Sequence, residues 1–281
     1  MFDKQYHSFA KAGMKHAAAL FQLQVAERFE ALQNNEKYTD QRCLVRHGYK
    51  QYSQCDEDGI LAEIFRRIGA GRRTFVEFGV GNGLENNTLS LLMLGWTGLW
   101  IDAHAGDLRT SLGEEMHSSK IAIVETFITK DNIDVTIRKN LDTAQELDLL
   151  VVDIDGNDWH VFNAINCVMP RVVVVEYNAK FRPPNMFCMD YEKSHEWNND
   201  DYFGASLKFL ETAMRTKGYE LVGCGLAGIN AFFVRKDLCG DHFLAPFTAE
   251  KHYEPARYYL CDMEAGHKTS IKSLKTVLKL R

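Results

Sequence analysis

Hydrophobic positions recur along the chain with two different periods, one typical of helices and one typical of buried strands. Within residues 8–33 the apolar residues follow one another at spacings of three or four, which predicts an amphipathic helix; they are Met14, Ala18, Phe21, Val25, Phe29 and Leu32. Short, nearly continuous apolar runs come later, and such runs are typical of strands that are buried on both faces of a parallel sheet. These runs are 74–79, 98–102, 121–125, 148–155 and 171–178.

Helical patterns separate these runs and follow them, at 84–94, 131–140, 158–167 and 204–217. The last two apolar runs, 218–225 and 229–238, are only three residues apart, which favours an antiparallel hairpin. Five strands with helical crossovers and a closing hairpin predict an α/β fold. We expect a doubly wound, mostly parallel seven-stranded sheet, with an antiparallel last strand at one side and an N-terminal helical extension.

Two extensions flank the predicted sheet domain, which covers residues 53–240. The helix of the first extension, 1–52, could pack on its own subunit or pair with a second copy in a homodimer. The second extension, 241–281, contains a basic amphipathic helix that could pack on the body or lie on an anionic membrane through 268–281. Its apolar face holds Ile271, Leu274 and Leu278, and its basic face Lys272, Lys275 and Lys279.

Composition and charge exclude several classes of protein. Hydrophobic residues make up 46% of the chain and charged residues 25%, values that argue against a disordered chain. The formal charge of −5 disfavours a broadly basic nucleic-acid binder, so we expect no nucleic acid among the partners. The seven cysteines form no Cys-x-x-Cys pair, which argues against a zinc ribbon or a redox motif. Without a signal-peptide core or a long apolar span, we expect a cytoplasmic protein, peripheral at most at the inner membrane face.

The first predicted strand runs into a glycine-rich loop, whose residues from Glu77 to Gly83 read EFGVGNG. In a doubly wound sheet, ligands bind beyond the carboxyl ends of the strands. The third glycine comes one residue earlier than in the dinucleotide fingerprint G-x-G-x-x-G, which disfavours an NAD-dependent oxidoreductase. The next strand ends at Asp102, where a carboxylate can accept hydrogen bonds from both hydroxyl groups of a ribose. The sequence therefore predicts a nucleoside-binding edge.

At these positions the sequence resembles the class I S-adenosylmethionine-dependent methyltransferases, over roughly residues 53–238. Their acidic residue followed by G-x-G-x-G is matched by Glu77, Gly79, Gly81 and Gly83, and their acidic ribose ligand by Asp102. More narrowly, SQCDEDGIL, FVEFGVGNGLENNT, GWTGLWID, LLVVDIDGND and RVVVVEYN resemble the FkbM-like branch, which is associated with O-methylation of sugars and natural products. One departure is Cys55, where that branch commonly has Gly.

The resemblance implies S-adenosylmethionine as the cofactor, held by the acidic residue and glycines of the first motif and by Asp102. It also implies that Asp131 and Asn132, after the third strand, lie at the adenine, although Asp131 could instead be a helix N-cap. Asp153, at the end of the fourth strand, is assigned to the same cofactor site.

Acidic and amide side chains end the fourth and fifth strands, where methyl transfer would take place. An aliphatic hydroxyl has a high pKa, so a divalent cation that acidifies it is one solution. Asp153 and Asp155 share one face by strand alternation, as do Glu176 and Asn178 on the next strand. Carboxylate and amide oxygens are the ligands that Mg²⁺ prefers. The arrangement is similar to the Mg²⁺ sites of catechol and macrolide-sugar O-methyltransferases, although there the fifth strand ends in Asp-Asn or Asp-Asp.

We predict Asp155, Glu176 and Asn178 as metal ligands, and Asp155, Glu176 and His195 as catalytic residues. Two alternatives stay open: a metal-free site for acceptor and base, or carboxylates that only order loops. His195 lies in the long polar connection 179–203, whose aromatic residues suit stacking on sugar faces, so this segment is a candidate lid.

The sequence thus predicts an O-methyltransferase that acts on a hydroxyl of a sugar, a polysaccharide or a glycosylated small molecule. A catalytically silent binding protein with the same fold is an alternative. Another is a haloacid-dehalogenase-type phosphohydrolase that uses Asp153 and Asp155, because LLVVDIDGND resembles its nucleophile strand. Asn157 stands where that motif has Thr, and strand-like segments precede it although it should begin the fold.

Overall fold

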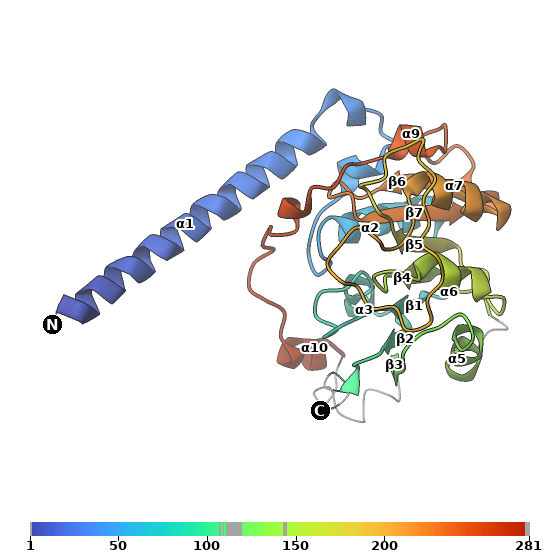
Figure 1. Ribbon diagram of the computed structural model, residues 1–281, viewed down its shortest axis with the longest axis horizontal. Helices are drawn as coiled ribbons and strands as arrows, with labels where there is room; N and C mark the ends of the chain where they lie inside the picture. The colour runs from blue at the N-terminus through green and yellow to red at the C-terminus, as the bar shows by residue number, and fades with distance from the viewer. Residues whose placement is uncertain (1, 107, 109, 111–119, 143–144, 279–281) are drawn as a thin grey trace.

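Seven strands form one sheet in the order β3-β2-β1-β4-β5-β7-β6. The computed structural model describes residues 2–106, 108, 110, 120–142 and 145–278 (Figure 1). All neighbouring strands up to β5 are parallel, whereas β7 runs antiparallel to both of its neighbours. The strands are β1 (Thr74–Phe78), β2 (Thr97–Asp102), β3 (Ile121–Glu125), β4 (Leu149–Val152), β5 (Val172–Glu176), β6 (Tyr219–Cys224) and β7 (Asn230–Arg235).

Helices cover both faces of the sheet, and each face has its own hydrophobic core. On β4, Leu149 and Val151 belong to one core and Leu150 and Val152 to the other, as the two-residue period of a strand requires. The first core is shared with α2 (Glu57–Ile68), α3 (Leu89–Met93), α8 (Lys236–Cys239) and α10 (Ile271–Leu278). The second is shared with α5 (Ile133–Asn140), α6 (Asp158–Ala164), α7 (Leu207–Thr216) and α9 (Ala249–His252). The doubly wound fold class is therefore confirmed.

The hairpin does not simply extend the sheet. The last strand, β7, inserts between β5 and β6 and pairs Glu176 with Asn230. The last strand is antiparallel, as predicted; it is second from the edge, and β6 is the edge strand. As a result, the first residue of β7 lies at the same edge as the last residues of the parallel strands.

Local structure differs from the sequence prediction at the start of α3. The segment expected to be helical from residue 84 is an ordered loop up to Thr88, and α3 begins only at Leu89. At the start of α2, Ser53 donates from its hydroxyl to Asp58 Oδ2. Asp58 Oδ2 also accepts the backbone N–H groups of residues 51–53, so this carboxylate organises the turn before the helix.

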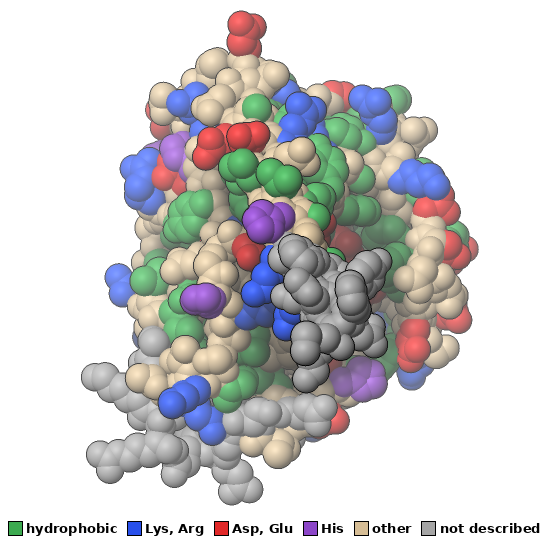
Figure 2. Space-filling model, turned by 90° about the vertical axis from the view of Figure 1, so that its left-hand side faces the viewer, with side chains coloured by type: hydrophobic (Ala, Val, Ile, Leu, Met, Phe, Trp, Pro, Cys, Tyr) green, Lys and Arg blue, Asp and Glu red, His purple; other side chains and the backbone are tan. Residues whose placement is uncertain are grey.

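The first helix, α1 (Phe2–Gln33), projects from the rest of the molecule (Figure 1). Near its carboxyl end Val25 and Phe29 are buried in a small core together with Leu226 and Leu260. Farther out, the same stripe is uncovered: Met14 is 74% exposed and other apolar side chains follow it. Hydrophobic side chains are visible among charged ones on the side toward which α1 projects (Figure 2).

The C-terminal helix packs against the body through its apolar side. Leu274 is fully buried and Ile271 packs beside it in the core that includes α3. This favours the body-packing alternative for the tail, whereas the side chain of Leu278 and residue Lys279 lie outside the described residues. Within the part of the chain that the structure describes, no helix is long and apolar enough to cross a membrane.

Candidate active site

A cavity of about 450 Å³ opens at the carboxyl edge of the sheet. Its walls come from the ends of β1, β2 and β4, from the loop after β3, and from the start of β7. A volume of this size is typical of small-molecule sites. Seven of the predicted site residues line it: Glu77, Gly79, Gly81, Asp102, Asp153, Asp155 and His195.

The glycine loop turns tightly along one wall. Gly79 has a φ of 74°, and a Cβ there would lie 1.7 Å from the carbonyl oxygen of Asp153, so only glycine fits. Gly81 has open space at its Cβ position, and its N–H donates to Asp102 Oδ2 at 2.8 Å. Gly83 does not line the cavity, because it lies beneath the side chains of Leu108 and Trp100, where a Cβ would not fit. Gly83 therefore allows this loop to pack closely against the core.

The carboxylate of Asp102 joins the ends of β1 and β2. Its second oxygen accepts the N–H of His104 at 2.7 Å, so both oxygens are oriented by backbone donors. This geometry holds an acidic side chain beside the glycine loop in the cavity wall, and its binding to a ribose stays a prediction.

Glu77 organises the loop that leaves the glycine turn. Its carboxylate accepts hydrogen bonds from the side chains of Asn86 and Thr88 and from the backbone N–H groups of Asn87 and Thr88. Burial raises the pKa of Glu77 to about 7, against the lowering effect of these donors. Glu77 would therefore act on a ligand mainly through the loop that it holds.

Asp131 and Asn132 lie beside the cavity rather than in it. Asp131 is exposed and pairs with Lys193 at 3.2 Å, and both line a neighbouring surface hollow. Asn132 bridges Thr129 and Phe127 of its own loop and occupies the N-cap position of α5, so the alternative prediction of Asp131 as the N-cap is wrong. The part of this loop that lines the cavity is 126–128, just before the two predicted residues.

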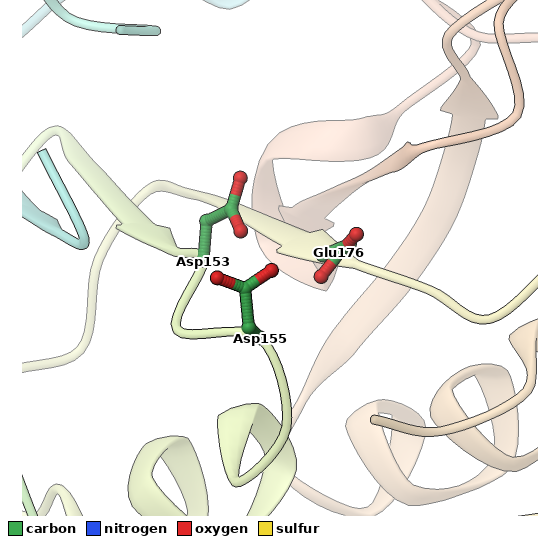
Figure 3. Close-up of side chains that lie close together, drawn as sticks. All are labelled: Asp153, Asp155 and Glu176. Carbon is green, nitrogen blue, oxygen red and sulfur yellow. The ribbon is translucent and has the colours of Figure 1, made fainter. Parts of the chain in front are cut away.

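Three carboxyl groups meet at the ends of β4 and β5 (Figure 3). Asp153, Asp155 and Glu176 each have an oxygen within 4.8 Å of the others, and Glu176 Oε2 is buried without a described partner. Burial and then the neighbouring acids raise the pKa of both Asp153 and Glu176 well above the usual range. Carboxyl groups this close either share protons or bind a cation.

Asn178 is not brought into this group. Its Nδ2 donates to the carbonyl oxygens of Asp201 and Phe203, and its Oδ1 accepts the N–H of Lys180. The predicted alternation with Glu176 fails because β5 ends at Glu176. Asn178 therefore orders the 179–203 segment. Asp153, and not Asn178 as predicted, is the third member of the group with Asp155 and Glu176.

His195 reaches the cavity from the 179–203 segment. Its Nε2 lies 3.2 Å from the carbonyl oxygen of Asp155, and its ring covers Gly156, where a Cβ would meet Cδ2 at 2.2 Å. A carbonyl oxygen can only accept, so in the neutral ring Nε2 carries the proton and Nδ1 has the free lone pair. Asn157 and His160 tie the same segment down through contacts with Glu192 and Met189.

Several residues of the cavity wall were not predicted from the sequence. Gln54, Asn86 and Asn230 contribute polar groups, and Phe127 contributes an aromatic surface. The polar pair Asn86–Asn87 falls inside the helix predicted from residue 84, so its place in the loop before α3 was not predicted. Nothing local marked Asn230, because its place depends on the insertion of β7 beside β5.

The charge around the cavity is one-sided. Five acidic residues line it and, in the described part of the chain, neither lysine nor arginine does; the acids are Glu77, Glu85, Asp102, Asp153 and Asp155. Such a wall favours a cationic or neutral ligand over an anionic one.

Comparison with known proteins gives a likeness of fold only. The chain matches no protein-family model and no curated protein. Among solved structures it is similar to the methyltransferase domain of bacterial CtHen1. That domain is 16% identical, covers 64% of this chain and 97% of its own, and has a TM-score of 0.40. It is also similar to the N-terminal domain of EvdMO1, solved with SAH and D-fucose, which is 13% identical. That match covers 75% of this chain and 94% of the domain, with a TM-score of 0.39. An O-methyltransferase family protein from Burkholderia thailandensis is 9% identical; the match covers 78% of this chain and 70% of that protein, with a TM-score of 0.36.

Proposed function

We propose that this chain is an S-adenosylmethionine-dependent O-methyltransferase that acts on a hydroxyl of a sugar, a polysaccharide or a glycosylated small molecule. The observation that carries the proposal is the contact between Asp102 and the glycine loop at Gly81, in one cavity at the ligand edge of a doubly wound sheet. An acid at the end of the second strand suits ribose hydroxyls, and the open backbone at Gly81 lets a nucleoside approach closely.

The charge of the cavity supports a sulfonium cofactor. S-adenosylmethionine carries the transferable methyl group on a positively charged sulfur. The carboxylate of Asp102 would stabilise such a cation and repel a phosphorylated cofactor. Gly79, Gly81 and Asp102 would hold its nucleoside, while Glu77 fixes the loop behind it.

We further propose that Asp153, Asp155 and Glu176 can bind Mg²⁺. Their converging oxygens and the unpartnered Glu176 Oε2 fit an oxygen-binding cation. A bound Mg²⁺ would lower the pKa of an acceptor hydroxyl. The residues of the chain would then orient the acceptor between this group and the cofactor.

His195 is the proposed general base. Its Nε2–H is held by the carbonyl oxygen of Asp155, so Nδ1 is free to take the hydroxyl proton. The ring lies on the cavity wall. Burial raises the pKa of Asp155, and the charge of His195 partly opposes this rise.

Isothermal titration with S-adenosylhomocysteine and with NADH tests the cofactor. We expect the first to bind and the second not to bind. Asp102→Ala should weaken the first by about tenfold or more, the size of a lost charge-assisted hydrogen-bond pair, with unchanged circular dichroism. Binding of NADH alone, or an unaltered affinity in the variant, would contradict the proposal. A screen of glycans with labelled S-adenosylmethionine, run with Mg²⁺ and with EDTA, then tests the acceptor and the metal.

A further inference from the structure

Two buried asparagine side chains in the cavity wall each leave one oxygen without a hydrogen-bond partner. Asn86, 6% exposed, lies on the loop between β1 and α3, and Asn230, 1% exposed, begins β7. Both line the cavity, and Oδ1 of each is buried with no partner among the described residues. Leaving such a group unpaired costs about 1–3 kcal/mol. Because both residues line the same cavity, a ligand bound there is the candidate partner for these oxygens.

Neighbouring carboxylates decide which end of each amide is free. Asn86 Nδ2 donates to Glu77 Oε2 at 2.8 Å, and Asn230 Nδ2 donates to Glu57 Oε1 at 3.0 Å. Glu77 Oε2 also accepts the backbone N–H of Thr88, so this oxygen is an acceptor, and an ionised Glu57 can likewise only accept. The NH₂ end of each amide therefore faces its carboxyl group. The reversed amides would place oxygen against oxygen. Both asparagines thus offer an acceptor, and the matching ligand group must be a donor.

The surroundings select a cationic donor. Glu57 and Glu77, the acids that hold the two amides, both contribute to raising the pKa of Asp153, so these charges act on one region. Glu57 itself is held by the N–H of Cys55 and the amide of Asn230. A primary ammonium group has three donors and no acceptor, and its charge is stabilised by this acidic wall.

We propose that Asn86 and Asn230 form a subsite for a primary ammonium group. The α-ammonium group of S-adenosylmethionine is the first source, and that assignment rests on the proposed function. An amino group on the acceptor is the second source of the same chemistry. In either case Glu77 and Glu57 position the amides, and Oδ1 of each accepts one hydrogen bond from the cation.

The test compares variants with ligands that differ only in the amino group. The variants are Asn86→Leu and Asn230→Leu, with Asn163→Leu on the exposed side of α6 as the matched control. The probes are S-adenosylhomocysteine and its analogue with hydrogen in place of the amino group. Glucosamine and glucose, titrated into protein saturated with S-adenosylhomocysteine, probe the acceptor side. Affinities are measured by isothermal titration.

For the cofactor source, we expect each variant to lose about tenfold in affinity for S-adenosylhomocysteine, as for a hydrogen bond to a charged group. The desamino analogue should bind the variants and the wild type equally well. For the acceptor source, the variants should keep their affinity for S-adenosylhomocysteine and lose a preference for glucosamine over glucose. Asn163→Leu should change neither.

An equal loss for both members of a ligand pair would show that the variants only disturb the wall, and would overturn the subsite. The wild type alone also decides, should a variant fail to fold: if it binds both members of each pair equally, no ammonium subsite exists. Absence of any S-adenosylhomocysteine binding to the wild type would instead overturn the proposed function. The glucosamine pair, titrated into the free protein, would then decide the subsite alone.

Discussion

At the scale of single residues, Gly156 is the position on which the placement of His195 depends. An alanine Cβ there would lie 2.2 Å from Cδ2 and 2.5 Å from Nε2 of His195, so the ring must leave the carbonyl of Asp155. We expect Gly156→Ala to lower kcat by about 100-fold, as loss of a general base does, with an unchanged Kd for S-adenosylhomocysteine. Methyl transfer to an acceptor from the glycan screen is the readout.

His195→Ala provides the control for this substitution. If both changes act on the same base, the double variant should be no slower than His195→Ala alone. Full activity of Gly156→Ala, or additive losses, would remove His195 from the catalytic group.

Asp56 gives a prediction about pH and stability. Burial, and then the charge of Glu57, raise the pKa of Asp56 to about 8. The folded protein therefore holds this proton more tightly than the unfolded chain, and its contribution to the free energy of unfolding is lost as the pH rises from about 4 to about 8. Asp56→Asn should reduce the slope of the free energy of unfolding against pH by up to about 1.4 kcal/mol per pH unit.

Urea unfolding at pH 5 and pH 8 measures this effect. The asparagine keeps an oxygen for the N–H of Leu226, which Asp56 Oδ2 accepts at 2.9 Å. A variant whose stability changes with pH as steeply as that of the wild type would show that Asp56 is ionised in the folded protein.

At the scale of elements, Ser206 connects the candidate lid to α7. Its hydroxyl donates to the carbonyl oxygen of Asn185 at 2.8 Å and accepts the N–H groups of Phe187 and Phe209. Ser206 is fully buried, so Ser206→Ala leaves buried groups unpaired as well as removing the N-cap. We expect a loss of about 2 kcal/mol in the free energy of unfolding.

Limited proteolysis adds a local readout for the same variant. Cleavage within 179–203 should become faster, because one end of this segment loses its attachment. Ser194→Ala, at a position on the surface hollow, is the control and should unfold and cleave like the wild type. A stable and protected Ser206→Ala would contradict this role of the serine.

Most elements could be predicted from the sequence because their pattern is local. Strands such as 149–152 are buried on both faces and read as continuous apolar runs, so their existence was clear. The insertion of β7 was not predictable, because a hairpin has the same local pattern at the edge of a sheet and inside it. The same holds for the free oxygens of Asn86 and Asn230, which depend on Glu77 and on Glu57, 173 residues away from Asn230.

At the scale of the whole molecule, α1 leaves an apolar stripe outside the body. Met14 is 74% exposed and Phe21 45%, although the same stripe is buried at Val25. Pairing with a second copy stays a prediction from the sequence. If it is right, the wild type should be a dimer by light scattering, and Phe21→Glu or Met14→Glu should make it a monomer.

Leu94→Glu is the matched control for these substitutions. Leu94 is 67% exposed on the body after α3, so the same change there should leave the mass unaltered. A wild type that is monomeric at micromolar concentration would show that α1 does not pair copies of this chain.

The direction of β7 also has a consequence for how the cavity is completed during synthesis. Every other strand that reaches the cavity contributes with its carboxyl end, whereas β7 contributes with its first residue, Asn230. A nascent chain that has emerged only as far as β6 therefore has its glycine loop, Asp102 and the three converging carboxyl groups, but lacks one wall. Ligand binding by the growing chain would begin late, because β7 must first insert between β5 and β6 and form long-range contacts with them.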